Sequence, residues 1–309
     1  MAEIEGVWTA LVTPFSEDGS LDLDAYRMLL HRQADAGITG VIPCGTTAEA
    51  PALTIEEKKL LIRVALDELA GTATRVIAGT GSNNAAQTLE TSRWASDQGV
   101  EAVLVVTPYY NKPSQAGLLT HFFSVADAVD CEVIPYNVPS RTGVSLHPET
   151  ITKLASHPRI TALKEATGSV SLASDILDHL FVAGRELNLL SGDDATFFPF
   201  LCVGGKGVIS VTSNLCPKTM TAIYDATKAG DLTLARQLHW NSFPLFRDLF
   251  LECNPVPIKY AMARAGLCGE HVRPPLAPLL QENAQKLEQT LRECRVLADE
   301  TCELSLLEV

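Results

Sequence analysis

The sequence lacks the residue spacings that bind metals or support redox chemistry. None of its 8 cysteines forms a C-x-x-C pair, and its 7 histidines show no H-x-x-x-H or H-x-H spacing. A zinc or iron site needs several such side chains to converge, so we expect no metal site. Scattered cysteines in a chain of 309 residues are typical of small, buried hydrophobic side chains in a reducing compartment.

The sequence also lacks long hydrophobic runs and an excess of basic residues. No apolar run approaches the roughly 18 residues that would span a bilayer, and the amino terminus MAEIEGVWTA has no basic segment followed by an apolar one. With 24 Lys and Arg against 37 Asp and Glu, the net charge of -13 offers no attraction to phosphate backbones or anionic membranes. We therefore expect a soluble cytoplasmic protein that binds neither nucleic acid nor membrane.

Short apolar runs, in contrast, recur along the first two thirds of the chain. They are continuously apolar rather than alternating, which is typical of parallel strands whose two faces are both buried. The eight runs that we predict to be strands are TALVTPF (9 to 15), GVIPCGTT (40 to 47), RVIAGTGS (75 to 82), AVLVVTPYY (102 to 110), EVIPYNVP (132 to 139), ITALKEAT (160 to 167), LNLLSGDD (187 to 194) and GVISVTS (207 to 213).

Amphipathic segments of helix length lie between these runs. In one of them Thr54 and Glu57 have the spacing of a capping box, and Gly71 marks the end of the helix. Eight strands alternating with helices over about 220 residues predict a (β/α)8 TIM barrel, with a doubly wound sheet as the alternative. Strand signals then stop. We predict a catalytic barrel over residues 1–225 and a helical C-terminal extension over residues 226–309 that packs on it.

Lys164 interrupts the apolar run ITALKEATG, residues 160 to 168. Burial disfavours the charged form of lysine, so at the mouth of a barrel its pKa is lowered and the neutral amine becomes a nucleophile for carbonyl carbon. This pattern indicates Schiff-base chemistry. The alternative is a structural lysine paired with a carboxylate, for which Glu165 is poorly placed because adjacent strand residues point to opposite faces.

Other polar residues end the predicted strands, and in a (β/α)8 barrel these ends form the active site. Tyr136 and Tyr110 offer phenols that can relay protons during imine formation and aldol addition; alternatively, they are rim aromatics. Thr46 and Thr47 can hold a carboxylate through their hydroxyls and turn amides, or they simply end a strand.

Two further features follow the later strands. The planar guanidinium of Arg141 suits a carboxylate, although a loop arginine is more often part of an exposed ion pair. The stretch from Gly192 through Asp193 to Asp194 is interpreted as a turn with an aspartate helix cap. A metal site is less favoured there because no histidine or third carboxylate converges on it.

Eight stretches distributed over the chain, as far as about residue 280, occur together and in a fixed order. They are TALVTPF, CGTTAEAP, VTPYYNKPSQAGL, YNVPSRTG, LKEATG, SGDD, GVISVTSN and NPVPIKYA. In this combination the chain resembles the pyruvate-dependent class I aldolases, and within them the dihydrodipicolinate synthase family. No single stretch would be specific, but the whole set is.

The resemblance implies a role for each matching residue. Lys164 would form the imine with pyruvate, with no other cofactor, and Tyr136 would be the central acid and base. Thr47 and Tyr110 would complete the proton relay, with Tyr110 reaching into the site of a neighbouring subunit. Thr46 would join Thr47 in holding the pyruvate carboxylate.

The second substrate implied by the resemblance is L-aspartate 4-semialdehyde. Its carboxylate would bind Arg141, while Gly192 and Ile209 match main-chain positions around the bound substrate. The implied product is 4-hydroxy-2,3,4,5-tetrahydrodipicolinate, on the route to diaminopimelate and lysine. The family is mostly tetrameric, so we expect a homotetramer.

Two alternative functions remain at this stage. N-acetylneuraminate lyases resemble the chain around Lys164 but carry no arginine in the loop that reads SRTG here, so Arg141 favours a short substrate with its own carboxylate. An N-acetylneuraminate lyase or a 2-keto-3-deoxy sugar acid aldolase is the alternative within the superfamily. A barrel that binds a keto acid without turning it over is the alternative outside it.

The chain departs from the family pattern at two places. Ala48 stands where the family usually has glycine, so the turn must accommodate a Cβ atom. The positions that match the lysine-inhibition site of sensitive members lack the histidine and glutamate that hold lysine, and we therefore predict weak or absent inhibition by lysine. These positions are Ala50, Ile55, Lys58, Asn83, Gln87 and Tyr109.

Overall fold

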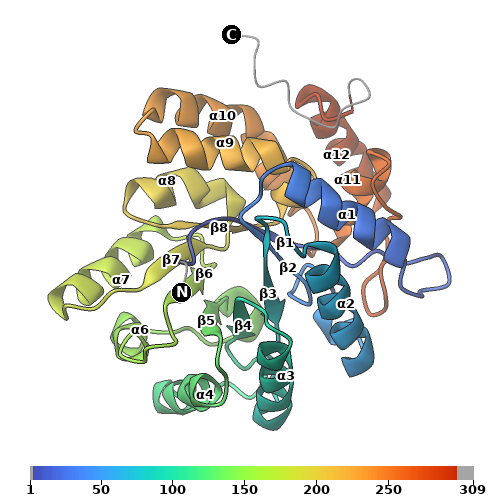
Figure 1. The fold of residues 1–309 in the computed structure, drawn as a ribbon. Coiled ribbons are helices and arrows are strands. Elements are labelled where there is room, and N and C mark those ends of the chain that lie inside the picture. The colour runs from blue at the N-terminus through green and yellow to red at the C-terminus, as the bar shows by residue number, and fades with distance from the viewer. Residues whose placement is uncertain (1–2, 298–309) are drawn as a thin grey trace. The chain divides into compact units, whose positions relative to one another are not determined.

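A computed structural model gives the fold and describes residues 3–297. Eight parallel strands form a closed barrel in which each strand neighbours the next one in the sequence, and helices lie between the strands (Figure 1). The predicted (β/α)8 fold is thus confirmed. The strands are β1 (Gly6–Ala10), β2 (Gly40–Ile42), β3 (Arg75–Gly79), β4 (Ala102–Val106), β5 (Glu132–Asn137), β6 (Ala162–Glu165), β7 (Asn188–Ser191) and β8 (Gly207–Ser210).

The first strand begins and ends earlier than predicted. The apolar run at 9–15 suggested a strand to residue 15, but β1 ends at Ala10. Beyond it, the Val12 N–H donates to the side-chain oxygen of Asn214 at 3.0 Å, and Pro14 has no N–H to donate. A side chain therefore takes the backbone donor that a longer strand would have used.

One compact unit of the chain comprises the segment before Val7 together with residues 75–209. Every residue of its strands β5 and β6 is buried, which explains the uninterrupted apolar runs. The helices of this unit are α3 (Ala85–Asp97), α4 (Gln115–Asp127), α5 (Pro139–Thr142), α6 (Pro148–Leu154), α7 (Val170–Val182), η2 (Asp194–Thr196) and α8 (Phe197–Cys202).

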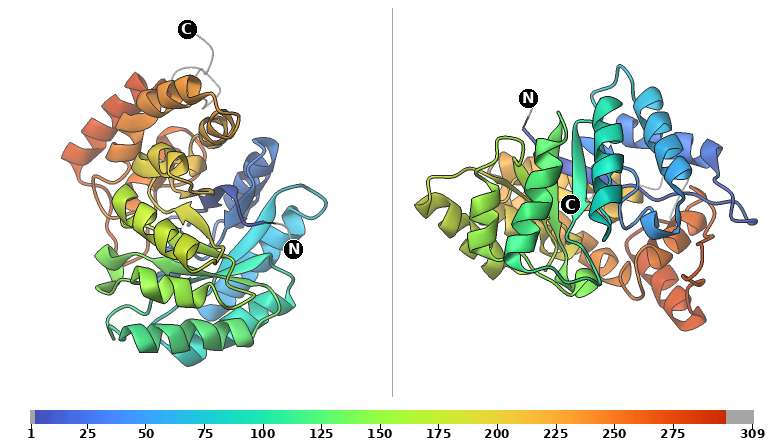
Figure 2. Two further views of the ribbon diagram at one scale, coloured as in Figure 1. Left: turned by 90° about the vertical axis from the view of Figure 1, so that its left-hand side faces the viewer. Right: turned by 90° about the horizontal axis from the view of Figure 1, so that it is seen from below.

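The second compact unit comprises residues 7–74 and those from 210 onward. Within it α9 and α10 lie side by side, and α12 packs against both α10 and α11 (Figures 1 and 2). The helices of this unit are α1 (Leu23–Asp35), η1 (Ala50–Ala52), α2 (Ile55–Glu68), η3 (Thr212–Asn214), α9 (Pro217–Lys228), α10 (Leu232–Asp248), α11 (Val256–Arg264) and α12 (Gln281–Glu293).

The predicted start of α2 is confirmed by its N-cap. The Thr54 hydroxyl accepts from the Glu57 N–H at 3.2 Å, and the Glu57 carboxylate accepts from the Thr54 N–H at 2.8 Å, which completes the capping box. At the other end the helix stops at Glu68 with Leu69 as its C-cap, before Gly71, which has a φ of 80°. Local sequence thus determines the start of this helix, and its end precedes the predicted glycine.

The proposed boundary between barrel and extension, after residue 225, falls inside α9. This helix is the first α-helix after β8 and follows the short helix η3, so it continues the alternation of strands and helices. The division into residues 1–225 and 226–309 stays a prediction. The terminal stretch TCELSLLEV, in which no sequence signal was found, and its Cys302 lie outside the described residues.

Candidate active site

The buried amine of Lys164 is the centre of the candidate site. Lys164 lies on β6 with only 6% of its surface exposed, and its Nζ is 4.2 Å from the centre of the Tyr136 ring. Burial lowers the pKa of Lys164, more than the nearby Tyr136 and Asp194 raise it, and the positive charge of Arg141 lowers it further. The environment therefore favours the neutral, nucleophilic form of this amine.

Tyr136 is held beside Lys164 by strand register. The two residues are directly opposite each other in the parallel pairing of β5 with β6, and Tyr136 is itself 6% exposed. The Tyr136 side chain also acts electrostatically on the Lys164 amine and raises its pKa. A phenol in this position can give a proton to, or take one from, a group that reacts at the lysine nitrogen.

Glu165 is not the partner of Lys164, as the strand alternation predicted. Its Oε2 accepts from the side-chain amide of Asn137 at 2.7 Å, and its Oε1 accepts from the Thr167 N–H at 2.6 Å. The carboxylate is 2% exposed and fully engaged in these bonds. The structural interpretation of Lys164 as the partner of Glu165 is therefore wrong.

Gly192, directly after β7, leaves room for the lysine side chain. A Cβ atom at this position would lie 2.9 Å from Cε of Lys164 and 2.5 Å from Cβ of Ala166, both closer than atoms can pack. The Gly192 N–H donates to the Glu165 carbonyl at 2.7 Å. The absence of a side chain at Gly192 is thus required by the close approach of Ala166 and of Lys164.

The neighbouring strand ends contain the other residues predicted in this unit. Asp193 caps the short helix η2 by accepting from the Thr196 N–H at 3.1 Å, which confirms the predicted turn and cap. Asp194 is buried and its charge acts on Lys164. Ile209 is 1% exposed on β8.

Arg141 lies on the one-turn helix α5, in the loop that follows β5. Its side chain is exposed, and its charge acts on Lys164. The loop is braced by Thr142, whose hydroxyl donates to the Val144 carbonyl at 2.9 Å and accepts from the Thr107 hydroxyl at 3.2 Å. The positively charged side chain of Arg141 therefore projects from a loop whose conformation is fixed by hydrogen bonds.

Tyr110, in the loop after β4, is arranged differently from Tyr136. Its side chain is 89% exposed and its backbone φ of 71° lies in the left-handed region, which residues other than glycine rarely adopt. The role in a neighbouring subunit that the resemblance implies stays a prediction.

Thr46 and Thr47 belong to the second unit, in the turn that follows β2. Thr47 is 2% exposed, and its hydroxyl oxygen accepts from the side-chain amide of Asn254 at 2.9 Å. The Thr46 carbonyl accepts from the Glu49 N–H at 3.0 Å. Ala48 is not among the described residues with positive φ, whereas Glu49 is, with a φ of 56°. The turn therefore accommodates the Cβ of Ala48, and the left-handed backbone conformation occurs one residue later, at Glu49.

The side chain of Glu49 anchors this turn through a buried ion pair. Lys259, fully buried on α11, donates to Oε1 of Glu49 at 2.8 Å and to the Thr13 carbonyl at 2.9 Å. The Arg273 N–H donates to Oε2 of Glu49 at 2.8 Å. Both oxygens of this carboxylate are thus held by groups from the carboxyl-terminal part of the chain.

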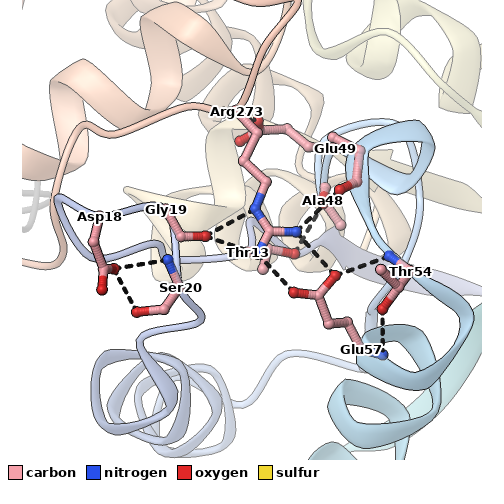
Figure 3. Close-up of polar contacts among 10 residues, drawn as sticks. Thr13, Asp18, Gly19, Ser20, Ala48, Glu49, Thr54, Glu57 and Arg273 are labelled. Atoms are coloured by element: carbon pink, nitrogen blue, oxygen red, sulfur yellow. Dashed lines mark hydrogen bonds and ion pairs between the residues drawn. The ribbon is translucent and has the colours of Figure 1, made fainter.

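The guanidinium of Arg273 also bonds the Gly19 carbonyl and both oxygens of Glu57 (Figure 3). These bonds hold the pKa of Glu57 at about 2, well below its ordinary value. The carboxylate that caps α2 is therefore also the partner of a distant arginine. Hydrogen bonds and a bidentate ion pair together tie the start of α2 to the segment around Arg273.

Sequence reasoning placed Asn137 beside Tyr136 at the end of a predicted strand, but it did not single out Asn254 or Lys259. Lys259 interrupts the apolar stretch PVPIKYAMA in the same way that Lys164 interrupts its strand, and that signal was available. Asn254 carries no local signal, because its partner is distant in sequence.

Within residues 3–297 no three His, Cys, Asp or Glu side chains are grouped in a way that could hold a metal ion. None of the helices in this range is long and apolar enough to cross a membrane.

A parallel eight-stranded barrel with a buried amine beside a phenol is the arrangement of a Schiff-base lyase. The model of the dihydrodipicolinate synthetase family matches residues 3–294, and the chain belongs to this family.

Known proteins resemble the chain over nearly its whole length. The 4-hydroxy-tetrahydrodipicolinate synthase of Trichlorobacter lovleyi is 45% identical over 95% of this chain and 99% of that protein, and the enzyme of Geobacter sulfurreducens is 43% identical with the same coverage. The crystal structure of dihydrodipicolinate synthase from Aquifex aeolicus superposes with a TM-score of 0.91 at 39% identity, covering 96% of this chain and 100% of that one. The enzyme from Methylacidiphilum fumariolicum SolV has the same TM-score at 42% identity, covering 94% and 96%.

Proposed function

We propose that the chain is a 4-hydroxy-tetrahydrodipicolinate synthase that condenses pyruvate with L-aspartate 4-semialdehyde in diaminopimelate and lysine biosynthesis. The observation that carries this proposal is the buried Lys164 amine, whose pKa is lowered, beside the Tyr136 phenol. Relatives at 43–45% identity, matched over 99% of their length, bear this name. No external cofactor is needed, because Lys164 itself supplies the covalent imine.

The reaction begins with attack of the neutral Lys164 nitrogen on the keto carbon of pyruvate. The carbinolamine loses water to give an imine, and loss of a proton from the methyl carbon gives an enamine. That carbon adds to the aldehyde of the second substrate, whose oxygen takes up a proton. The amino group of the second substrate then displaces Lys164 from the imine carbon, which closes the ring and frees the enzyme. Tyr136 is placed to move the protons that these steps require.

The remaining site residues take the roles that family resemblance suggests. Thr46 and Thr47 bind the pyruvate carboxylate, and Thr47 with Tyr110 extends the proton relay. Arg141 binds the carboxylate of the semialdehyde. Gly192 and Ile209 border the substrate, consistent with the lack of space for a side chain at Gly192.

We further propose that the protein is a homotetramer, the usual assembly of the family. A related structure at 36% identity is described as a monomeric variant, so the assembly needs its own measurement, for example sedimentation velocity. The same protein preparation tests the predicted weak or absent inhibition by lysine, by addition of L-lysine to the condensation assay.

The deciding experiment compares two reactions on one preparation. We expect turnover with pyruvate and L-aspartate 4-semialdehyde and none with N-acetylneuraminate; activity only with N-acetylneuraminate would overturn the choice of substrate. Borohydride added with pyruvate should leave a stable mass increase on Lys164. Folded protein that yields no adduct would overturn the imine mechanism and favour the alternative of a barrel that binds a keto acid without turning it over.

Replacement of Tyr136 by phenylalanine tests proton transfer. Tyr136→Phe removes the hydroxyl and keeps the ring beside Lys164, so we expect kcat to fall by about 10²- to 10⁴-fold. Thermal unfolding should change little by comparison, and the adduct with pyruvate should still form, though more slowly. Unchanged turnover in a folded variant would show that another group moves the protons. Tyr224→Phe, on α9, is the matched control.

Replacement of Arg141 by glutamine tests recognition of the second substrate. Loss of a charged hydrogen bond to a carboxylate is expected to raise the KM for L-aspartate 4-semialdehyde by about tenfold or more. The KM for pyruvate should move far less. Arg185→Gln, at another exposed position of the same unit, is the control. Equal changes in both KM values would argue against a specific role for Arg141.

A further inference from the structure

A buried side-chain pair lies on the reverse side of the two strands that carry Lys164 and Tyr136. Asn137 follows Tyr136 on β5, Glu165 follows Lys164 on β6, and the two are directly opposite each other in the strand pairing. Because successive strand residues point to opposite faces, this second pair points away from the reacting amine. Asn137 is fully buried and Glu165 is 2% exposed.

Each polar atom of this pair has a specific partner. The Asn137 amide nitrogen donates to Oε2 of Glu165 at 2.7 Å, and its oxygen accepts from the Leu146 N–H at 2.9 Å. Oε1 of Glu165 accepts from the Thr167 N–H at 2.6 Å. The bonds therefore converge on the Glu165 carboxylate, from Leu146 through Asn137 on one side and from Thr167 on the other, and they fix which end of the Asn137 amide faces the carboxylate.

This chain of bonds connects the segments that carry the proposed catalytic residues. Leu146 ends the loop that begins after β5 and includes Arg141, so its N–H anchors the far end of that loop to Asn137. Thr167 lies just beyond β6, three residues after Lys164. A shift in the Asn137–Glu165 pair therefore moves the Arg141 loop relative to the strand end that holds the amine.

We propose that Asn137 and Glu165 are positioning residues for the condensation: the hydrogen bonds that converge on Glu165 set the position of the Arg141 loop relative to Lys164. This inference rests on the proposed function. The pair touches no reacting atom. The pair acts by holding the loop that contains Arg141 at a fixed position relative to the Lys164 amine. Small displacements of substrate-binding groups reduce the reaction rate strongly.

An exchange of donor and acceptor tests the proposal. Asn137→Asp places a second carboxyl group against that of Glu165. Glu165→Gln replaces one carboxylate oxygen by an amide nitrogen, which then faces another donor, either the Asn137 amide or the Thr167 N–H. Combining the two substitutions restores every bond. The new carboxylate on β5 accepts from the Leu146 N–H and from the new amide on β6, and the oxygen of that amide accepts from the Thr167 N–H.

We expect each single variant to raise the KM for L-aspartate 4-semialdehyde by about tenfold or more, with a much smaller change in the KM for pyruvate. The pyruvate adduct at Lys164 should still form with borohydride. The double variant should return to within about threefold of the parent protein. This rescue separates positioning from a simple loss of stability.

Asn188→Asp is the matched control. Asn188 begins β7 at the opposite end of the barrel strands from Lys164, and its amide donates to the Ile4 carbonyl at 3.3 Å. Asn188→Asp removes the donor to the Ile4 carbonyl and lowers the stability of the protein somewhat. It should leave the KM values for pyruvate and for L-aspartate 4-semialdehyde unchanged.

The outcomes separate the two levels of inference. A parent protein that does not condense the two substrates refutes the proposed function, whatever the variants do. With an active parent, single variants with unchanged KM values refute the positioning role. So does a double variant that is unfolded or no better than the single variants, because restored bonding would then not restore position.

Discussion

Replacement of Lys164 by arginine is expected to lower condensation by about 10⁴-fold or more, the scale on which a covalent nucleophile contributes. Arginine keeps the positive charge and much of the length, but its pKa is too high for a neutral form to exist in the protein. No adduct should form with pyruvate and borohydride. Mass spectrometry of the treated protein and a coupled turnover assay measure the two effects.

The matched control is Lys153→Arg, the same change at an exposed lysine of α6. It should leave turnover and adduct formation unchanged. The lowered pKa of Lys164 adds a pH test: its neutral form appears at lower pH than that of an ordinary lysine, so the rate of adduct formation should be half-maximal below about pH 10.4. A half-maximal rate at or above that pH would contradict the role of burial.

The second large effect is on stability and comes from the ion pair under the Thr46–Thr47 turn. Lys259→Met removes the cation from a pair in which the side chains of Lys259 and Glu49 are 0% and 1% exposed. The buried carboxylate is left without its charge partner, and this is expected to cost about 3 to 5 kcal/mol of the free energy of unfolding. Denaturant unfolding followed by circular dichroism measures the loss.

The double variant Glu49→Gln with Lys259→Met should recover most of that loss, because no uncompensated charge remains. An exposed pair supplies the comparison: Glu56, 80% exposed, bonds Lys59 at 3.3 Å, and Glu56→Gln should cost less than about 1 kcal/mol. A single variant at Lys259 as stable as the parent protein would show that the pair is dispensable.

The parts of the site that sequence reasoning could predict are those with a local signal. The barrel follows from apolar runs of strand length, and Lys164 stood out because a charge is costly in such a run. The alternation of side chains along β6 correctly turned Glu165 away from it. Each of these inferences needed only neighbouring residues.

The rest depends on contacts that neighbouring residues do not reveal. The bond between Asn254 and Thr47 joins positions 207 residues apart, and the pair of Lys259 with Glu49 joins positions 210 apart. The early end of β1 arises in the same way, from the side chain of Asn214. The family resemblance supplied roles for Thr46 and Thr47, but not the residues that hold them in place.

The anchoring of the Glu49 turn limits how far the chain can fold while it is being synthesised. Thr47, Glu49 and Glu57 are synthesised 207, 210 and 216 residues before their respective partners Asn254, Lys259 and Arg273. Until then the turn contains a carboxylate that favours water over burial. A nascent chain or a fragment that stops before Asn254 contains every strand of the barrel and none of these three partners. The segment from Asn254 to Arg273 therefore supplies the partners on which the turn after β2 and the start of α2 depend.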